Sequence, residues 1–574
     1  MKRDDQPVSR AGKALSIALA LLAPARMAWI VFTFGENNLS NDYLFRVPLV
    51  SSILDGAGSV ELFVREAWNA GGHSMLAVVP VYWLSARFFA WDVRLELAVG
   101  LLAAGATLAL ITATLPPRAR WTLLPLLSLL LFSTTKVSSF TFGESTLQMG
   151  LSQLGVVIAA VAFAKVDKRP LVRAVRAAGG GVLASWSWGG GVMAWPVLFA
   201  AFALRRERRL AAWAILGAGT VLGLAQYAYL LPHRTPDGAP VSISWVKARL
   251  FFDLLGRPFV NGITYMGPRE WSQAAGAAGL LLLAVLFFLF RSSLKEQVAP
   301  LLLVSWATLV AVEIAAFRND VTPWYVSSMI FFWVGLVVLL AAAPGPLRAG
   351  GILVVAFLTL RVQRSWEDKS FYLPSRAPAS AACLREWRTA PPSCHDRVFQ
   401  WGNGGRPNEL AFLGEPLEQR GLSVFGPRPT YLLQGDLAVG RVGIETPNAT
   451  AFLSRDARTP GDPNDFRRLD LVLAPGAAVT WRVDLPPNLR SARFESRVRA
   501  STDDPMLARG ARVAVMGEAV ETRVLVPAGG RELLSLDLRA YAGKTVTLRL
   551  TAEEAEGDAP LVFEAPKIEL RLAR

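Results

Sequence analysis

Residues 97–115 read LAVGLLAAGATLALITATL and carry no charged side chain. A helix of this length measures about 28 Å, which matches a hydrocarbon layer of about 30 Å. Comparable apolar runs recur over the first two thirds of the chain, for example from Gly276 to Phe290 with its flanks. Hydrophobic residues make up 52% of the chain and charged residues only 18%, so most of it is not water-facing surface. The sequence predicts a polytopic α-helical membrane protein.

Eleven apolar runs are predicted to cross the membrane, judged from their length and their flanks. They cover residues 14–34, 94–114, 121–135, 147–164, 177–188, 190–204, 210–231, 271–290, 299–317, 323–343 and 349–363. The basic segment before the first run is typical of a signal peptide. Arg26 interrupts that run and no convincing cleavage site follows it, so we expect an uncleaved first span.

The basic residues lie in short clusters between alternate runs. A formal net charge of +15 could indicate a nucleic-acid partner, but such clusters are the signal that orients membrane proteins with their positive loops inside. We therefore predict a bacterial inner-membrane protein with a cytoplasmic N-terminus, an extracytoplasmic C-terminal region and no nucleic-acid partner. The clusters are Lys2/Arg3/Arg10/Lys13, Arg118/Arg120, Lys165/Lys168/Arg169/Arg173/Arg176, Arg205/Arg206/Arg208/Arg209, Arg291/Lys295 and Arg348.

Residues 74–91 form a twelfth apolar stretch, which decides the orientation. If it crossed, the two richest basic clusters would move outside, against the positive-inside bias. Pro80 breaks the stretch, and His73, Trp83 and Trp91 give it the polar and aromatic character of an interface segment. We predict a helix that lies along the outer interface without crossing.

The region after residue 363 differs in composition. Residues 364–468 are rich in Arg, Pro and Gly, which indicates an extracytoplasmic linker region. Cys383 and Cys394 are the two cysteines of the chain and lie in this region. An oxidising compartment and the short separation favour a local disulfide between them, and two free thiols are the alternative.

Residues 469–574 contain short runs with a period of two, separated by turns such as Pro475-Gly476. This pattern predicts an all-β sandwich domain. Trp481 and Tyr541 are its chief candidates for exposed, sugar-binding aromatics. The alternative is a lid or assembly domain with no ligand of its own.

Two acidic residues follow or precede spans on the predicted outer side. Asp42, eight residues after the first span, has the position of a general base whose pKa is raised beside the membrane. The alternative is an N-cap for a helix over 45–54. Together with Asp42, Glu144 could position a hydroxyl and a cation, or the two could serve as base and orienter. The alternative for Glu144 is an acid that favours a helix start through the macrodipole.

Three further residues are candidates for substrate binding. Arg318 ends the ninth span and Tyr325 opens the tenth, where a guanidinium could hold a phosphate. The alternatives for Arg318 are a membrane anchor or an ion pair with Glu313. His73 at the start of the interfacial stretch is the third candidate, and an ordinary interface residue is its alternative.

The sequence contains no metal-ligand cluster, nucleotide-binding glycine loop or nucleophile–base constellation, so the cofactor is unknown and a divalent cation is left open. An enzyme that faces outward has no supply of nucleotide sugars. An activated substrate must therefore arrive on a lipid carrier.

The order and spacing of several weak features resembles the GT-C glycosyltransferases, within them the bacterial aminoarabinose- and mannosyl-transferase-like membrane proteins. The resemblance covers about residues 14–363. It rests on Asn41-Asp42, Trp68-Asn69 to His73, Trp91-Asp92-Val93-Arg94, Phe132-Ser133 through Glu144 to Gly150, Ser185-Trp186-Ser187 to Trp195-Pro196, Arg205-Arg206, and Arg318 with Tyr325, then on Cys383 to Cys394 and Arg420-Gly421-Leu422-Ser423.

The resemblance implies an inverting transfer of a sugar from a polyprenyl-phosphate carrier to an envelope glycan, lipid or protein acceptor. Asp42 is then the base that acts on the acceptor hydroxyl, and Arg318 and Tyr325 hold the carrier phosphate. The alternatives are a transporter or flippase of lipid-linked glycans, which should contain broken helices and charged groups such as Arg26 and Glu313, and a non-catalytic scaffold for envelope assembly.

Overall fold

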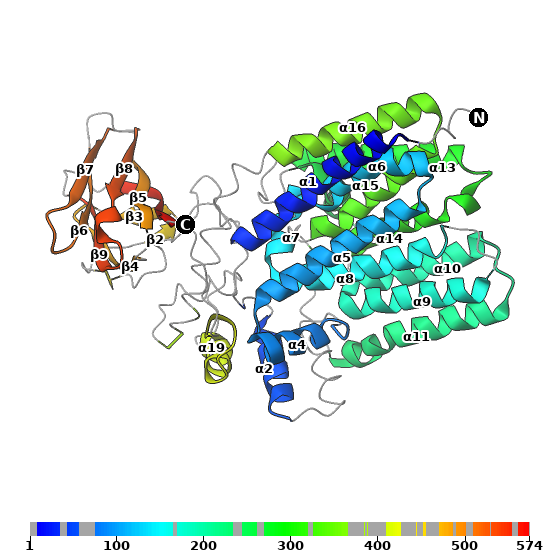
Figure 1. Ribbon diagram of the computed structural model, residues 1–574, viewed down its shortest axis with the longest axis horizontal. Helices are drawn as coiled ribbons and strands as arrows, with labels where there is room; N and C mark the ends of the chain where they lie inside the picture. Colours follow the sequence, from blue (N-terminus) through cyan, green and yellow to red (C-terminus); the bar gives the residue numbers. More distant parts are fainter. Residues whose placement is uncertain are drawn as a thin grey trace. The chain divides into compact units, whose positions relative to one another are not determined.

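The computed structural model divides the chain into two compact units (Figure 1), Met1–Gly35 with Phe45–Glu367, and Glu36–Leu44 with Asp368–Arg574. The division into 1–363, 364–468 and 469–574 stays a prediction. The structure describes residues 8–34, 39, 43–56, 75–164, 169–233, 244–260, 269–318, 325–364, 384, 387–388, 409–425, 443–444, 452–454, 470–473, 475–485, 489–500, 509–527, 530–553 and 561–572.

The first unit is helical throughout its described residues. Its helices are α1 Arg10–Phe34, α2 Tyr43–Leu54, α4 Val79–Phe89, α5 Val93–Thr114, α6 Pro117–Leu131, η1 Thr134–Lys136, α7 Val137–Thr141, α8 Gly143–Val161, α9 Pro170–Ser187, η2 Gly189–Met193, α10 Ala194–Leu204, α11 Leu210–His233, α12 Trp245–Gly256, η3 Arg257–Phe259, α13 Arg269–Leu289, η4 Leu294–Glu296, α14 Val298–Phe317, α15 Val326–Ala341 and α16 Gly345–Arg364.

Six helices among the described residues are long and apolar enough to cross a membrane. They are α1, α5, α11, α13, α14 and α16, so the chain is a multi-pass membrane protein. Every other predicted span overlaps a helix, but α6, α10 and α15 have only 15, 11 and 16 residues. The predicted count of eleven spans is therefore not confirmed.

Polar contacts join neighbouring helices near each end of the bundle. At the end that we call the basic end, Ser16 of α1 donates to the carbonyl of Trp121 on α6, and Arg205 after α10 donates to the carbonyl of Phe163 after α8. At the opposite end, which we call the site end, Gln363 of α16 accepts a hydrogen bond from the backbone of Thr134 after α6. Of the predicted basic clusters, Arg205/Arg206/Arg208/Arg209 lie between α10 and α11 and Arg291/Lys295 between α13 and α14, whereas Arg118/Arg120, Arg173/Arg176 and Arg348 lie near the starts of α6, α9 and α16.

Glycines allow two helix pairs to approach until their backbones touch. A Cβ at Gly155 of α8 would collide with the backbone of Gly180 and Ala184 on α9, and one at Gly180 with the backbone of Gly155. On α12 and α13, a Cβ at Gly256 would meet the carbonyl of Ser272, and one at Gly276 the carbonyl of Phe252. These contacts dock α12, which lies within the predicted outer loop 232–270, directly onto α13.

The predicted interfacial stretch forms a short helix. α4 has 11 residues with Pro80 in its first turn, so it is about 16 Å long. That is too short to cross a bilayer about 30 Å thick. The backbone N–H of Ala77 donates to the carbonyl of Trp186 (2.9 Å), which fixes the start of α4 at the end of α9.

The second unit contains two five-stranded antiparallel sheets, in the orders β1-β4-β9-β6-β7 and β2-β3-β10-β5-β8. The strands are β1 Gly443–Ile444, β2 Phe452–Ser454, β3 Asp470–Leu473, β4 Ala478–Asp484, β5 Leu489–Ala500, β6 Arg509–Val515, β7 Glu521–Val526, β8 Arg531–Asp537, β9 Thr545–Ala552 and β10 Leu561–Leu572, preceded by α19 Glu409–Gln419 and η7 Ser423–Phe425. β1 and β2 fall inside the predicted linker, so the sheets take strands from further upstream than expected.

Both sheets contribute to one hydrophobic core. Phe494 on β5 and Phe563 on β10 face Leu548 on β9 within it, because apolar side chains alternate along each strand. Tyr541 also belongs to this core and is 7% exposed. The prediction that Tyr541 is an exposed, sugar-binding aromatic is therefore wrong, and its ring serves packing instead.

Candidate functional site

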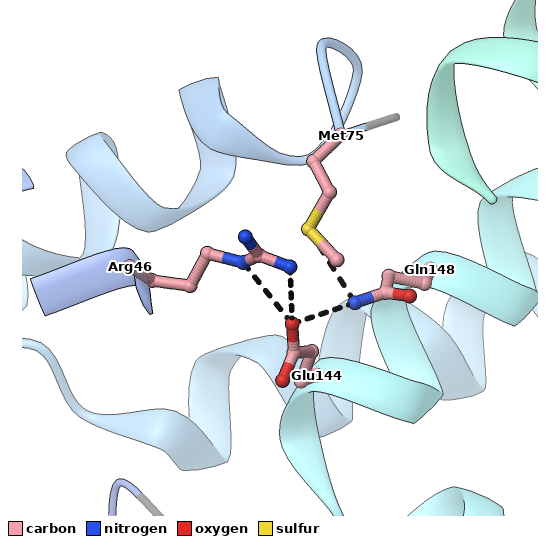
Figure 2. A network of polar contacts seen from close by, with 4 residues as sticks. All are labelled: Arg46, Met75, Glu144 and Gln148. Carbon is pink, nitrogen blue, oxygen red and sulfur yellow. Dashed lines mark hydrogen bonds and ion pairs between the residues drawn. The ribbon is translucent and has the colours of Figure 1, made fainter. Parts of the chain in front are cut away.

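A buried ion pair joins α2 to the start of α8 at the site end of the bundle (Figure 2). Oε1 of Glu144 accepts hydrogen bonds from Nε (3.1 Å) and Nη2 (2.9 Å) of Arg46. It also accepts one from Nε2 of Gln148, one turn further along α8 (2.8 Å). The side chains of Arg46 and Glu144 are each 1% exposed. All three donors thus converge on a single oxygen of Glu144.

Glu144 lies in the first turn of α8, where the macrodipole favours a negative charge. Glu144 therefore has the helix-start position that its alternative interpretation requires, while its role in substrate binding stays a prediction. The partner, Arg46, was missed by sequence reasoning. The signal was present, since Arg46 stands in the otherwise uncharged helix YLFRVPLVSSIL, and a guanidinium at such a place needs a partner.

Three more buried side chains extend the cluster. Nε1 of Trp91 donates to Oε1 of Glu96 on α5 (2.9 Å), and the ring of Trp91 lies 6.2 Å from that of Tyr82 on α4. Burial raises the pKa of Tyr82 well above its usual value, and the charges of Glu144 and Glu96 raise it further. Tyr82 thus lies within the electrostatic influence of both carboxylates.

The entry to the second predicted span is capped as its sequence suggests. Asp92 precedes α5 and accepts hydrogen bonds from the backbone N–H (3.1 Å) and Nε (2.8 Å) of Arg94. An aspartate that binds the free N–H groups of a helix start stabilises that start. Oγ of Ser85 on α4 donates to the carbonyl of Asp92 (3.3 Å), which joins the start of α5 to α4.

Arg318 and Tyr325 lie where the sequence places them, at the end of α14 and just before α15. Arg318 is exposed, and its carbonyl accepts a hydrogen bond from Nζ of Lys247 (2.5 Å). Within the described residues Arg318 forms no ion pair with Glu313, so that alternative is not supported. Tyr325 is 8% exposed, with its ring 6.5 Å from that of Trp188.

Helix α8 connects the two predicted regions. Gln153 of α8 donates to Oγ of Ser327 at the start of α15 (3.0 Å). Glu144 and Gln153 are nine residues apart on this helix, a rise of about 14 Å. The start of α15, which follows Tyr325, therefore packs on the same helix that carries Glu144.

Four predicted residues, Asp42, His73, Cys383 and Cys394, lie outside the described residues. Their roles, including the disulfide, stay predictions. Within the described part of the chain, no group of three His, Cys, Asp or Glu side chains could hold a metal ion.

No protein-family model and no curated protein matches the chain. A solved structure, the arabinofuranosyltransferase AftD from mycobacteria, aligns over 99% of this chain and 63% of its own, with 13% sequence identity and a TM-score of 0.30. The chain thus spans less than two thirds of that protein. A similarity of this level carries no argument about fold or activity.

Proposed function

We propose that the chain is a GT-C-type glycosyltransferase, which transfers a sugar from a polyprenyl-phosphate carrier to an envelope glycan, lipid or protein acceptor on the outer face of the bacterial inner membrane. The observation that carries the proposal is the Arg46–Glu144 pair, a buried charged group at one end of a bundle of membrane helices. Ionisable groups at such places mark functional sites more often than anchors.

Asp42 and Glu144 are the two acids that the sequence singles out on separate loops. Glu144, held by Arg46 and Gln148, would position the substrate hydroxyls, and His73 would contribute a further contact.

In the proposed reaction the lipid-linked sugar enters from the bilayer. Asp42 takes the proton of the acceptor hydroxyl, whose oxygen attacks the anomeric carbon. The bond from that carbon to the phosphate oxygen breaks, and polyprenyl phosphate leaves. Arg318 and Tyr325 stabilise the negative charge that develops on the phosphate. Attack from the opposite face inverts the anomeric configuration.

The test is incubation of the purified full chain with a labelled polyprenyl-phosphate sugar. We expect transfer or slow hydrolysis of the sugar by the wild type, and none by Asp42→Asn. Glu207→Gln is the matched control, because Glu207 pairs with Arg173 (3.5 Å) at the basic end, with both side chains 9% exposed. Transfer by Asp42→Asn at the wild-type rate would remove Asp42 from the mechanism.

Transport of a lipid-linked glycan is the second candidate function, and Glu313 favours it. This residue lies in the candidate span α14, and its Oε2 is enclosed without a hydrogen bond among the described residues. Acidic groups of this kind serve as proton or substrate sites in transporters. In the same assay, a carrier that binds but stays unreacted, and that crosses the bilayer of vesicles containing the protein, would favour transport over transfer.

A further inference from the structure

Lys136 is a buried lysine that the proposed mechanism does not use. It ends the short helix η1 at the site end and is 3% exposed. Its Nζ lies 4.8 Å from the centre of the Phe140 ring. Among the described residues its ammonium group has no hydrogen-bond or ion-pair partner.

An ammonium in this position is costly, because burial removes its water shell without supplying an anion. A cation–π contact returns only a part of that cost. Burial accordingly lowers the pKa of Lys136 to about 7, and no charged neighbour contributes to the shift. Glu144 and Arg46 therefore do not act on Lys136, which forms a separate centre of charge.

The backbone around Lys136 is held firmly by the end of α16. Oε1 of Gln363 accepts from the N–H of Thr134 (3.3 Å), and Nε2 of Gln363 donates to the carbonyl of Leu129 and to Oγ of Ser133 (3.3 Å each). Gln363 is itself 8% exposed. A buried amide that makes three hydrogen bonds to one turn fixes that turn, and so pre-organises its lysine.

We infer that Lys136 binds the phosphate group of a membrane lipid. The location favours a lipid over a soluble anion, because η1 directly follows α6, whose predicted span ends at residue 135, and phosphates mark that level of a bilayer. The stacked rings of Phe132 and Phe140 (6.0 Å, 7°), which are 3% and 4% exposed, give the ammonium apolar surroundings, which suit a lipid better than a hydrated anion. The lipid is either the polyprenyl-phosphate carrier or a bilayer phospholipid.

This inference extends the proposed function, but its test measures lipid binding and needs no sugar transfer. The full chain in uncharged detergent is titrated with a polyprenyl monophosphate, with the matching polyprenol, with phosphatidylglycerol and with inorganic phosphate, and binding is followed by thermal stabilisation. We expect the wild type to bind the polyprenyl phosphate and not the polyprenol. Lys136→Met should weaken binding at least tenfold, and Lys136→Arg should restore most of it.

Lys13→Met is the matched control, because Lys13 also lies over an aromatic ring (Trp121, 5.9 Å) but at the basic end. Lys136→Gln replaces the Met variant if that one fails to fold. Equal binding of phosphatidylglycerol identifies the bilayer as the source of the phosphate, and equal binding of inorganic phosphate overturns the lipid assignment. Unchanged binding by folded Lys136→Met and Lys136→Gln overturns the whole inference. Lost transfer with intact binding would count against the glycosyltransferase proposal alone.

Discussion

Arg46 and Glu144 stand 98 positions apart in the sequence, yet Nη2 of one lies 2.9 Å from Oε1 of the other in a place that water does not reach. The pair ties the short helix α2 to the start of α8. Variants of this pair can therefore test both the stability of the site end and the proposed chemistry.

Arg46→Met should destabilise the protein by about 3–5 kcal/mol, because it leaves the carboxylate of Glu144 buried without its counter-charge. The double variant Arg46→Met/Glu144→Leu should lose less than the single one. Thermal unfolding in detergent measures both. Arg388→Met is the control, since its pair with Glu418 is exposed (62% and 34%) and should contribute little to stability. If the double variant lost as much stability as the two single variants together, Arg46 and Glu144 would not be coupled.

The stability of the protein should depend on pH through Lys136. In the unfolded chain the lysine keeps its proton up to about pH 10.5, whereas in the folded protein it loses the proton near pH 7. The folded state thus binds fewer protons between these values, and stability rises with pH across that window.

Lys136→Met should therefore be more stable than the wild type at pH 6, by up to about 5 kcal/mol. The advantage should shrink as the pH rises from about 7 to 10. Unfolding curves in neutral detergent, without phosphate-bearing lipids, check this. An advantage that stays constant with pH would contradict a buried ammonium as the cause.

Gly276→Leu should destabilise the bundle by about 1–3 kcal/mol, since any side chain there meets the backbone of Phe252 on α12. Gly217→Ala is the contrasting change: a Cβ at Gly217 on α11 meets nothing within 4 Å. It should raise stability by about 0.5–1 kcal/mol, because glycine is unfavourable inside a helix. Thermal unfolding of the two variants should shift in opposite directions.

The predicted orientation can be tested by labelling single cysteines with a membrane-impermeant maleimide. In a Cys383→Ser/Cys394→Ser background, Trp245→Cys at the start of α12 should react in intact cells, because Trp245 is 70% exposed at the site end. Arg206→Cys at the basic end should react only after the cells are opened. The reverse pattern would place the site end in the cytoplasm and exclude a lipid-linked sugar on the outer face as substrate.

The predicted disulfide has its own test. Peptide mapping of the protein, alkylated before reduction, should recover Cys383 and Cys394 in one cross-linked pair. Alkylation of both thiols in the unreduced protein would show the free form instead.

The elements that depend on local pattern were predictable from the sequence. The run 94–114 differs by one residue from α5, Val93–Thr114, and the short period-two runs predicted after residue 469 correspond to the strands β3 to β10. Helix α9 shows where the pattern misleads. Its span was expected from residue 177, but it begins at Pro170, because Arg173 in its first turns is neutralised by Glu207 and can be buried.

The candidate site was predictable only where a residue stands at a helix end. Glu144, Arg318 and Tyr325 were found in this way. Arg46 and Lys136 were not, because what distinguishes them is their surroundings: a carboxylate 98 positions away for Arg46, and the lack of any anion among the described residues for Lys136. Sequence periodicity holds no information on such long-range relationships.

The hold of Gln363 on η1 has a mechanical consequence. Gln363 is the last residue but one of α16. The carbonyl of its neighbour Val362 also accepts a hydrogen bond from Oγ1 of Thr134 (3.4 Å), so two successive residues of one helix end hold Thr134. A shift of that helix end would therefore move the turn that carries Lys136.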